Sequence, residues 1–358
     1  MPNLRQLAVL SDDFELVSPA QHLLDSFLIG FRRRGAWERP QVPVTVWTAK
    51  KPSADLLERR RTDFGLTIAD SLAAAAPSAD AIMVVGAKGS VAAPEAILGP
   101  ALKAARAGTR VFTFGLVAER RARAQEFLQL ARDAQLWLAS GTAIAGTVRL
   151  PDVELPNGTR VREGLVVVCG DFPAAELSGL EALLPLLERR QGGETGVHQL
   201  RYLEGPAVWE AGDKGEWSWP LLAAAISRSH TPQGHPVLDG RTEDLVGLGL
   251  VPQLARHPRG WLLEHADGLR SAILVLDGVV ADINFAVRTA GQQVISAQVF
   301  RPPPPQEEEY SRLAGALFEF FRTGTAPWPG SRGLLETGVI SAMASESGRS
   351  GAWTVLPS

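Results

Sequence analysis

The sequence is poor in cysteine and lacks long apolar runs. Cys169 is the single cysteine among 358 residues, which excludes an internal disulfide framework and any metal site built from several cysteines. No stretch approaches about 18 uninterrupted apolar residues, so we expect no membrane-spanning segment. Residues 1–10 lack the apolar core and cleavage site of a signal peptide, and we therefore expect a cytoplasmic protein.

The chain also lacks a strong excess of charge. Its net charge is −3, with 45% hydrophobic and 21% charged residues, which excludes a disordered chain and gives no basis for nucleic-acid binding. Residues 1–150 carry 19 basic and 14 acidic side chains, a net charge of +5, whereas the remaining residues carry −8. Together with the length, this uneven charge indicates two domains with different roles.

Short, uninterrupted apolar runs alternate with helical segments over residues 1–145. We expect strands at residues 7–10, 44–47, 81–85, 111–114 and 137–139. We expect helices beginning at Pro19, with Ser18 as the N-cap, and covering residues 53–63, 101–107 and 119–133. This alternation predicts an α/β fold that begins with a Rossmann-like, doubly wound parallel sheet.

The pattern changes over residues 146–358. Strands are expected at residues 164–169, 197–203, 262–265, 269–276, 279–286 and 294–300, and helices at 174–190, 307–322 and 331–348. Asp267-Gly268 and Asp277-Gly278 stand where hairpin turns would be. We predict an α+β domain with a large, mostly antiparallel sheet and helices on one face. The two terminal helices can pack back on the first domain.

Three stretches resemble one known family in their order and spacing. They are residues 56–65 (LLERRRTDFG) followed by 79–82 (ADAI), residues 101–111 (ALKAARAGTRV) and residues 318–324 (FEFFRTG). They are similar to the glucose–fructose oxidoreductase and inositol dehydrogenase (Gfo/Idh/MocA) family. The resemblance implies an NAD(P)-dependent oxidoreductase that acts on a sugar-like or polyhydroxylated small molecule between two domains. It also implies a homodimer or tetramer formed through the open face of the second sheet.

The turn after the first strand departs from the family pattern. Family members hold the dinucleotide on a glycine-rich turn, because glycine lets the backbone approach the pyrophosphate at a helix N-terminus. Residues 11–19 (SDDFELVSP) contain no glycine, and Asp12, Asp13 and Glu15 place carboxylates there. Asp12 and Asp13 are either cofactor-binding residues or acids of a loop that caps the next helix.

Two lysines follow the second strand, where the family places the group that contacts the adenosine ribose. If a dinucleotide binds, Lys50 and Lys51 favour the 2′-phosphate of NADP over NAD; otherwise they belong to a solvated basic loop. His22, on the first helix, lies near the crossover of the doubly wound sheet and can face a ligand. A chain without any cofactor is the alternative.

The family's catalytic residues are also replaced. The motif lysine after the fourth strand falls at Phe114-Gly115-Leu116, and the histidine and aspartate of the second domain fall at Ser178 and Glu181. Glu181 is therefore the first candidate for the acid or base. Glu194, within residues 191–196 (QGGETG), is a second candidate, and the alternative for this segment is a helix cap and turn.

His230 is the third catalytic candidate. With His235 and Asp239 it supplies the ligand types of zinc or iron, but the spacing matches no recognised metal motif, and we predict no metal site. Trp209, Trp217 and Trp219 can stack on a ligand or form a small core under long loops; we favour the core. Three functions stay open: a divergent oxidoreductase, an enzyme of another class, and a binding or partner subunit without catalysis.

Overall fold

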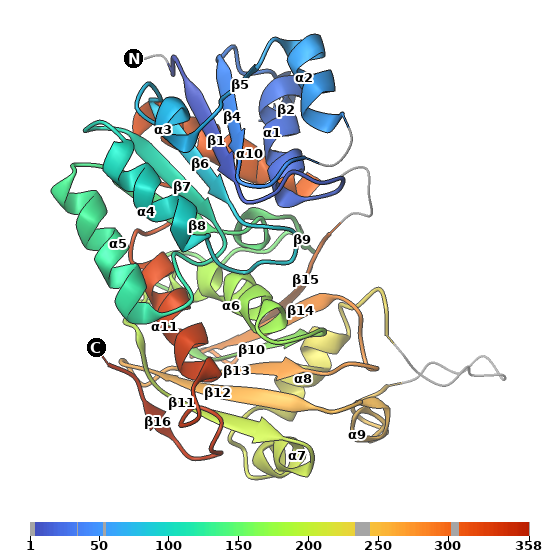
Figure 1. Cartoon of the computed structure of the whole chain (residues 1–358). Coiled ribbons are helices and arrows are strands. Elements are labelled where there is room, and N and C mark those ends of the chain that lie inside the picture. The colour runs from blue at the N-terminus through green and yellow to red at the C-terminus, as the bar shows by residue number, and fades with distance from the viewer. Residues whose placement is uncertain (1–3, 34, 53–54, 233–243, 302–307, 358) are drawn as a thin grey trace. The chain divides into compact units, whose positions relative to one another are not determined.

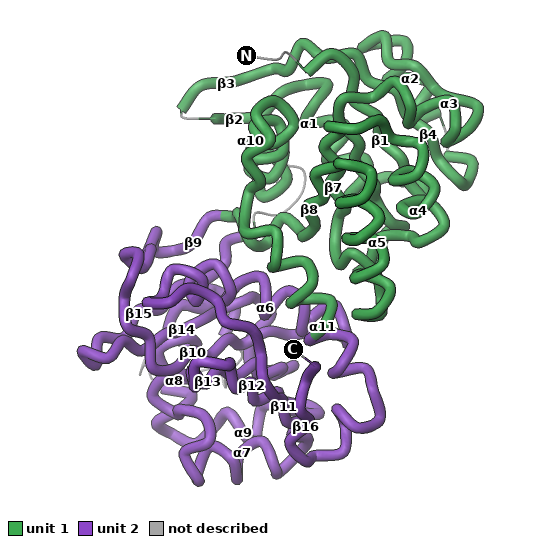
Figure 2. The backbone as a smooth tube through the Cα atoms, turned by 90° about the vertical axis from the view of Figure 1, so that its left-hand side faces the viewer, with its two compact units in different colours: residues 1–147, 301–338 green, residues 148–300, 339–358 purple. Residues whose placement is uncertain are grey.

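The computed structural model describes residues 4–33, 35–52, 55–232, 244–301 and 308–357. The chain forms two compact units, each built from two separate stretches of sequence (Figure 2). Unit 1 comprises Met1–Thr147 and Arg301–Gly338, and unit 2 comprises Val148–Phe300 and Val339–Ser358.

Unit 1 contains a six-stranded sheet in which neighbouring strands are all parallel (Figure 1). Its order is β5-β4-β1-β6-β7-β8. The strands are β1 (Leu7–Ser11), β4 (Val44–Thr48), β5 (Thr67–Ile68), β6 (Ala81–Val85), β7 (Arg110–Phe114) and β8 (Trp137–Gly141). All residues of β1 and β6 are buried, as expected for uninterrupted apolar strands covered on both faces. The predicted doubly wound sheet is confirmed.

Helices cover both faces of this sheet. One apolar core contains residues of α1 (Pro19–Ile29), α2 (Leu56–Phe64) and α10 (Glu308–Thr323); the other contains residues of α3 (Leu72–Ala75), α4 (Glu95–Ala104) and α5 (Arg121–Asp133). The expected helix at 101–107 was misplaced, since α4 begins at Glu95 and Ala105 is already extended. A hairpin of β2 (Phe31–Arg33) and β3 (Ala36–Glu38) and a 3₁₀ turn, η1 (Ile144–Gly146), complete the unit.

Unit 2 contains an eight-stranded, mostly antiparallel sheet, which confirms the predicted class. Its order is β16-β11-β12-β13-β10-β14-β15-β9. The strands are β9 (Arg149–Leu150), β10 (Val161–Val168), β11 (Val197–Glu204), β12 (Arg259–His265), β13 (Arg270–Val275), β14 (Ile283–Thr289), β15 (Val294–Val299) and β16 (Thr354–Val355). Asp267-Gly268 joins the antiparallel strands β12 and β13, as predicted.

The hairpin predicted at Asp277-Gly278 was wrong. Strand β10 lies between β13 and β14 and pairs in parallel with β13, so the strands on either side of Asp277 are not neighbours. The next strand begins at Ile283 rather than at residue 279, and the Asp277 carboxylate instead accepts a hydrogen bond from the Gly170 N–H at 2.8 Å.

Helices lie on both faces of the second sheet, whereas one covered face was expected. Helix α6 (Ala174–Leu187) packs on β10, β13 and β14 from one side. On the other side, α7 (Pro206–Asp213) and α8 (Trp219–Ile226) share an apolar core with the sheet. Two further helices are α9 (Val251–Leu254) and α11 (Arg332–Ala344). No helix in the described part of the chain is long and apolar enough to cross a membrane.

Candidate functional site

The turn after β1 lies at the point of unit 1 where the strand order reverses. Strand β1 is flanked by β4 and β6, and the turn is bonded to both: the Ala49 N–H donates to the Ser11 carbonyl at 2.9 Å, and the Asp12 N–H donates to the Val85 carbonyl at 3.1 Å. In open α/β sheets, ligands bind at this reversal, outside the carboxyl ends of the strands. The predicted residues Asp12, Asp13 and Lys50 therefore meet at the expected place.

Two charged groups of this turn, Lys50 and Asp12, form an ion pair. Lys50 Nζ lies 2.8 Å from Asp12 Oδ2, and Lys88 Nζ donates to the Leu16 carbonyl at 3.3 Å. Asp13 is only 8% exposed, and its Oδ1 has no hydrogen-bond partner among the described residues. Burial raises the pKa of Asp13, and the negative charge of Glu15 adds to this shift. Lys50 therefore contacts a carboxylate of the turn, through a side chain that is 62% exposed.

The start of α1 is capped by the chain itself. Ser18 Oγ accepts the Gln21 N–H at 3.3 Å, and Gln21 Oε1 accepts the Val17 N–H at 2.6 Å, a reciprocal cap. Pro19, at the first helical position, has no N–H to offer. Val17 adopts a left-handed φ of 58°, which is rare and strained for a β-branched residue. The N–H groups that bind an anion at such a helix start are thus largely used or missing.

Aromatic side chains stack beside the end of β7. The Phe114 ring lies 6.0 Å from the Tyr310 ring of α10, which stacks 4.7 Å from His22 of α1. The next residue, Gly115, has a φ of +89°, and a Cβ there would come within 2.4 Å of the Val91 carbonyl oxygen. The stack occupies the end of the strand after which the resemblance would place a catalytic lysine.

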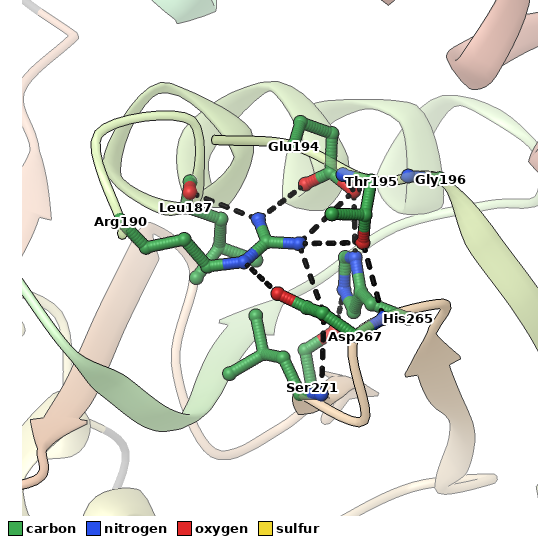
Figure 3. Close-up of polar contacts among 9 residues, drawn as sticks. Leu187, Arg190, Glu194, Thr195, Gly196, His265, Asp267 and Ser271 are labelled. Atoms are coloured by element: carbon green, nitrogen blue, oxygen red, sulfur yellow. Dashed lines mark hydrogen bonds and ion pairs between the residues drawn. The ribbon is translucent and has the colours of Figure 1, made fainter. Parts of the chain in front are cut away.

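In unit 2, Glu194 belongs to a nearly buried network of charges (Figure 3). Arg190 follows α6 and has a side chain only 2% exposed; its Nη1 lies 2.8 Å from Glu194 Oε2, and its Nε lies 2.8 Å from Asp267 Oδ2. Glu194 Oε1 accepts the Gly196 N–H at 2.9 Å and faces His265 Nδ1 at 2.8 Å. The network thus joins the end of α6, the 191–196 loop and the β12–β13 turn.

Protonation of Glu194 is strongly disfavoured in this network. Burial alone would raise its pKa, but hydrogen bonds from His265 and Arg190 outweigh burial and lower the pKa of Glu194 to about 2. The pKa of Asp267 is also lowered, because Arg190 outweighs its burial. A carboxylate held ionised in this way, with its oxygens already bonded, stabilises the fold and is a weak base.

Ser271, His265 and Glu194 are connected in the order found in serine hydrolases. Ser271 Oγ lies 3.0 Å from His265 Nε2, and His265 Nδ1 faces Glu194. However, Ser271 is 5% and His265 2% exposed, so a substrate cannot reach the hydroxyl. The arrangement is therefore an internal hydrogen-bond chain that fixes the β12–β13 turn.

Several solved structures have a fold similar to that of this chain. GenD2 of gentamicin A biosynthesis, solved with NAD, is 13% identical with a TM-score of 0.61, over 100% of this chain and 98% of GenD2. The myo-inositol dehydrogenase of Lactobacillus casei, solved with NAD(H) and myo-inositol, is 12% identical with a TM-score of 0.59, over 99% and 97%. The chain has the fold of the Gfo/Idh/MocA-type dehydrogenases. No family model and no curated protein sequence matches the chain.

A third similar structure, biliverdin reductase of Synechocystis sp. PCC 6803, was solved with biliverdin and NADP⁺ and has a TM-score of 0.51 at 14% identity, over 95% of this chain and 98% of that protein. Rossmann domains hold the pyrophosphate of such cofactors on glycines and on free N–H groups of a helix start. In this chain, the same place holds an acidic turn with the Lys50–Asp12 ion pair and a helix start capped by Ser18 and Gln21. The residues present do not fit a dinucleotide bound in the usual way.

The remaining cofactor candidates, Lys51 and His22, take no part in the Lys50–Asp12 ion pair. Lys51 is exposed beside Lys50, and His22 contacts Tyr310. No described group of three or more His, Cys, Asp and Glu side chains is arranged to hold a metal ion, and His235 and Asp239 lie outside the described residues.

The catalytic candidate Glu181 is buried within α6, at 1% exposure, and Ser178 is half-buried. Glu176, five residues earlier on the same helix, was not predicted from the sequence. Glu176 is fully buried, and its Oε1 accepts hydrogen bonds from Arg259 Nε at 2.8 Å and Trp261 Nε1 at 3.3 Å. Its spacing of five residues from Glu181 gave no motif by which to find it.

His230 and the cluster of tryptophans, the two other predicted features, make contacts that stabilise the fold. His230 is exposed, and its backbone N–H donates to Asp282 at 2.9 Å, which anchors the start of its loop. Trp217 is buried and donates its indole N–H to the Val208 carbonyl at 2.8 Å, while Trp219 packs 4.6 Å from it. The tryptophans thus form part of the core beneath α8, as we favoured.

Proposed function

We propose that the protein binds a sugar-like or polyhydroxylated small molecule on a dehydrogenase fold, and that its chemistry is not NAD(P)-dependent hydride transfer. The observation that carries this proposal is the closed turn after β1, where Lys50 is paired with Asp12 and the start of α1 is capped by Ser18 and Gln21. A phosphate arriving there would have to break these contacts and approach Asp13 and Glu15, which costs free energy instead of gaining it.

An oxidoreductase that uses NADP or NAD on the same class of molecule is the second candidate. It is supported by the full-length likeness to GenD2 and to the L. casei inositol dehydrogenase, each solved with NAD or NAD(H). Exposed Lys51 would then contact the 2′-phosphate of NADP.

The first prediction concerns cofactor binding. We expect titration with NADPH and with NADH to give no saturable quenching of tryptophan fluorescence up to about 1 mM, a binding free energy weaker than about 4 kcal/mol. The double variant K50E/K51E is the matched control and should behave like the wild type. Saturation at micromolar NADPH that weakens at least tenfold in K50E/K51E would instead establish the second candidate.

The second prediction concerns the ligand class. A ligand that binds only the folded state stabilises it by mass action. A cyclic polyol or sugar of the bound class should therefore raise the free energy of unfolding by about 3 kcal/mol at a concentration one hundred times its Kd, and raise the thermal midpoint with it. Glu181, the first catalytic candidate, is only 1% exposed, so a ligand arriving from solvent cannot reach its carboxylate. The variant E181Q, which keeps the shape of the side chain, should therefore leave this ligand-induced stabilisation unchanged. Loss of the stabilisation in E181Q, with an unchanged circular dichroism spectrum, would instead show that Glu181 contacts the ligand.

A further inference from the structure

One face of the unit 2 sheet is covered by a segment of the same chain. The inward side chains come from five neighbouring strands, β11, β12, β13, β10 and β14, and are nearly inaccessible: Leu203, Leu262, Ala272, Leu274, Leu165, Val167 and Ala286. Helices α7 and α8 supply the opposing layer, including Val208, Leu221, Leu222 and Ala225, and α8 also packs on β15. This layer buries the apolar face of the sheet without a partner molecule.

Polar contacts fix both ends of α8 to the sheet. At its start, Arg288 Nη2 of β14 donates to Ser218 Oγ at 3.0 Å, and Ser218 is the N-cap of α8. After its end, Arg228 Nε donates to Ser296 Oγ of β15 at 2.9 Å, and Ser229 Oγ donates to Asp282 at 2.8 Å. Side-chain bonds at both ends hold α8 in one position on the sheet.

A stable interface needs about 800 Å² of surface from each partner. The apolar part of this sheet face is already buried inside the chain and does not offer such a surface to a second copy.

We propose that residues 206–226 occupy the place on this sheet face that a second copy would otherwise cover, and that the protein is a monomer. The dimer or tetramer implied by the family resemblance is the opposite outcome of the same measurement. The proposal rests on the packing of α7 and α8 and is independent of the ligand and of the cofactor.

The test uses the full chain. Light scattering coupled to gel filtration, at loading concentrations from about 1 to 100 μM, should give the mass of one chain, 38.3 kDa, throughout. Amide hydrogen exchange of residues 222–226 should be slow and independent of protein concentration, because a seated helix exchanges only when it opens. A stable dimer or tetramer overturns the proposal. So does a monomer in which residues 222–226 exchange as fast as an exposed loop, since α8 would then not be seated on the sheet.

Discussion

Replacing Arg190 with alanine should lower the free energy of unfolding of unit 2 by about 3–5 kcal/mol, as is usual when one partner of a buried ion pair is removed. The guanidinium lies 2.8 Å from both Glu194 and Asp267, and its side chain is only 2% exposed. Its removal leaves two carboxylates near each other without their shared cation. Urea unfolding followed by tryptophan fluorescence measures the loss.

Two variants serve as controls for R190A. Lys214 also forms an ion pair in unit 2, with Glu210 at 3.7 Å, but both side chains are 65% exposed, so K214A should cost less than about 1 kcal/mol. R190K keeps the charge and loses the planar fork that contacts both carboxylates, so its loss should fall between the other two. Equal losses in R190A and K214A would contradict the network described for Arg190.

Acid should remove the stabilisation that Glu194 contributes. Its pKa of about 2 in the folded protein lies below the ordinary value of 4.5, so the contribution is complete above about pH 5 and is lost as the pH falls through 4.5 towards 2. The full difference corresponds to about 3 kcal/mol, of which about 2 kcal/mol is lost between pH 5 and pH 3. Asp267 acts in the same direction, because its pKa is lowered as well.

The variant E194Q isolates this contribution. It lacks the titrating carboxylate, so the stability difference between wild type and E194Q should shrink by about 2 kcal/mol from pH 5 to pH 3. Urea midpoints of both proteins across this range measure the difference. Two parallel curves would show that Glu194 is not held ionised by Arg190 and His265.

The parallel sheet of unit 1 could be predicted because its signals are local. Uninterrupted apolar runs mark β1 and β6, and Ser18-Pro19 and Gly65 mark where α1 begins and α2 ends. The order of strands in unit 2 could not be predicted. Strand β10 pairs with β13 across about a hundred residues of chain, and no short-range sequence pattern indicates which strand pairs with β10. The turn at Asp277-Gly278 has the composition of a hairpin but joins strands that β10 separates.

The candidate sites could likewise be predicted only in part. The sequence placed Asp12, Asp13 and Lys50 near one another through the known order of a doubly wound sheet, but not their pairing, which depends on side-chain conformation. It identified Glu194 from the glycines around it and missed His265 and Ser271, because both read as ordinary strand residues. Arg190, four residues before Glu194, was the one partner whose spacing could have been recognised.

The interleaving of the two units in the sequence has a consequence for how the protein is made. Residues of α10, among them Leu317 and Phe321, complete an apolar core of unit 1 that otherwise comes from the first 143 residues. Unit 2 likewise receives β16, which pairs with β11. Domains fold as units while the chain is synthesised, N-terminal first. The first part of unit 1 is synthesised before α10, and strands β9 to β15 of unit 2 are translated between them. Until α10 is made, the apolar surface of α1 that it covers stays exposed. The incomplete chain at this point of synthesis is therefore prone to aggregation.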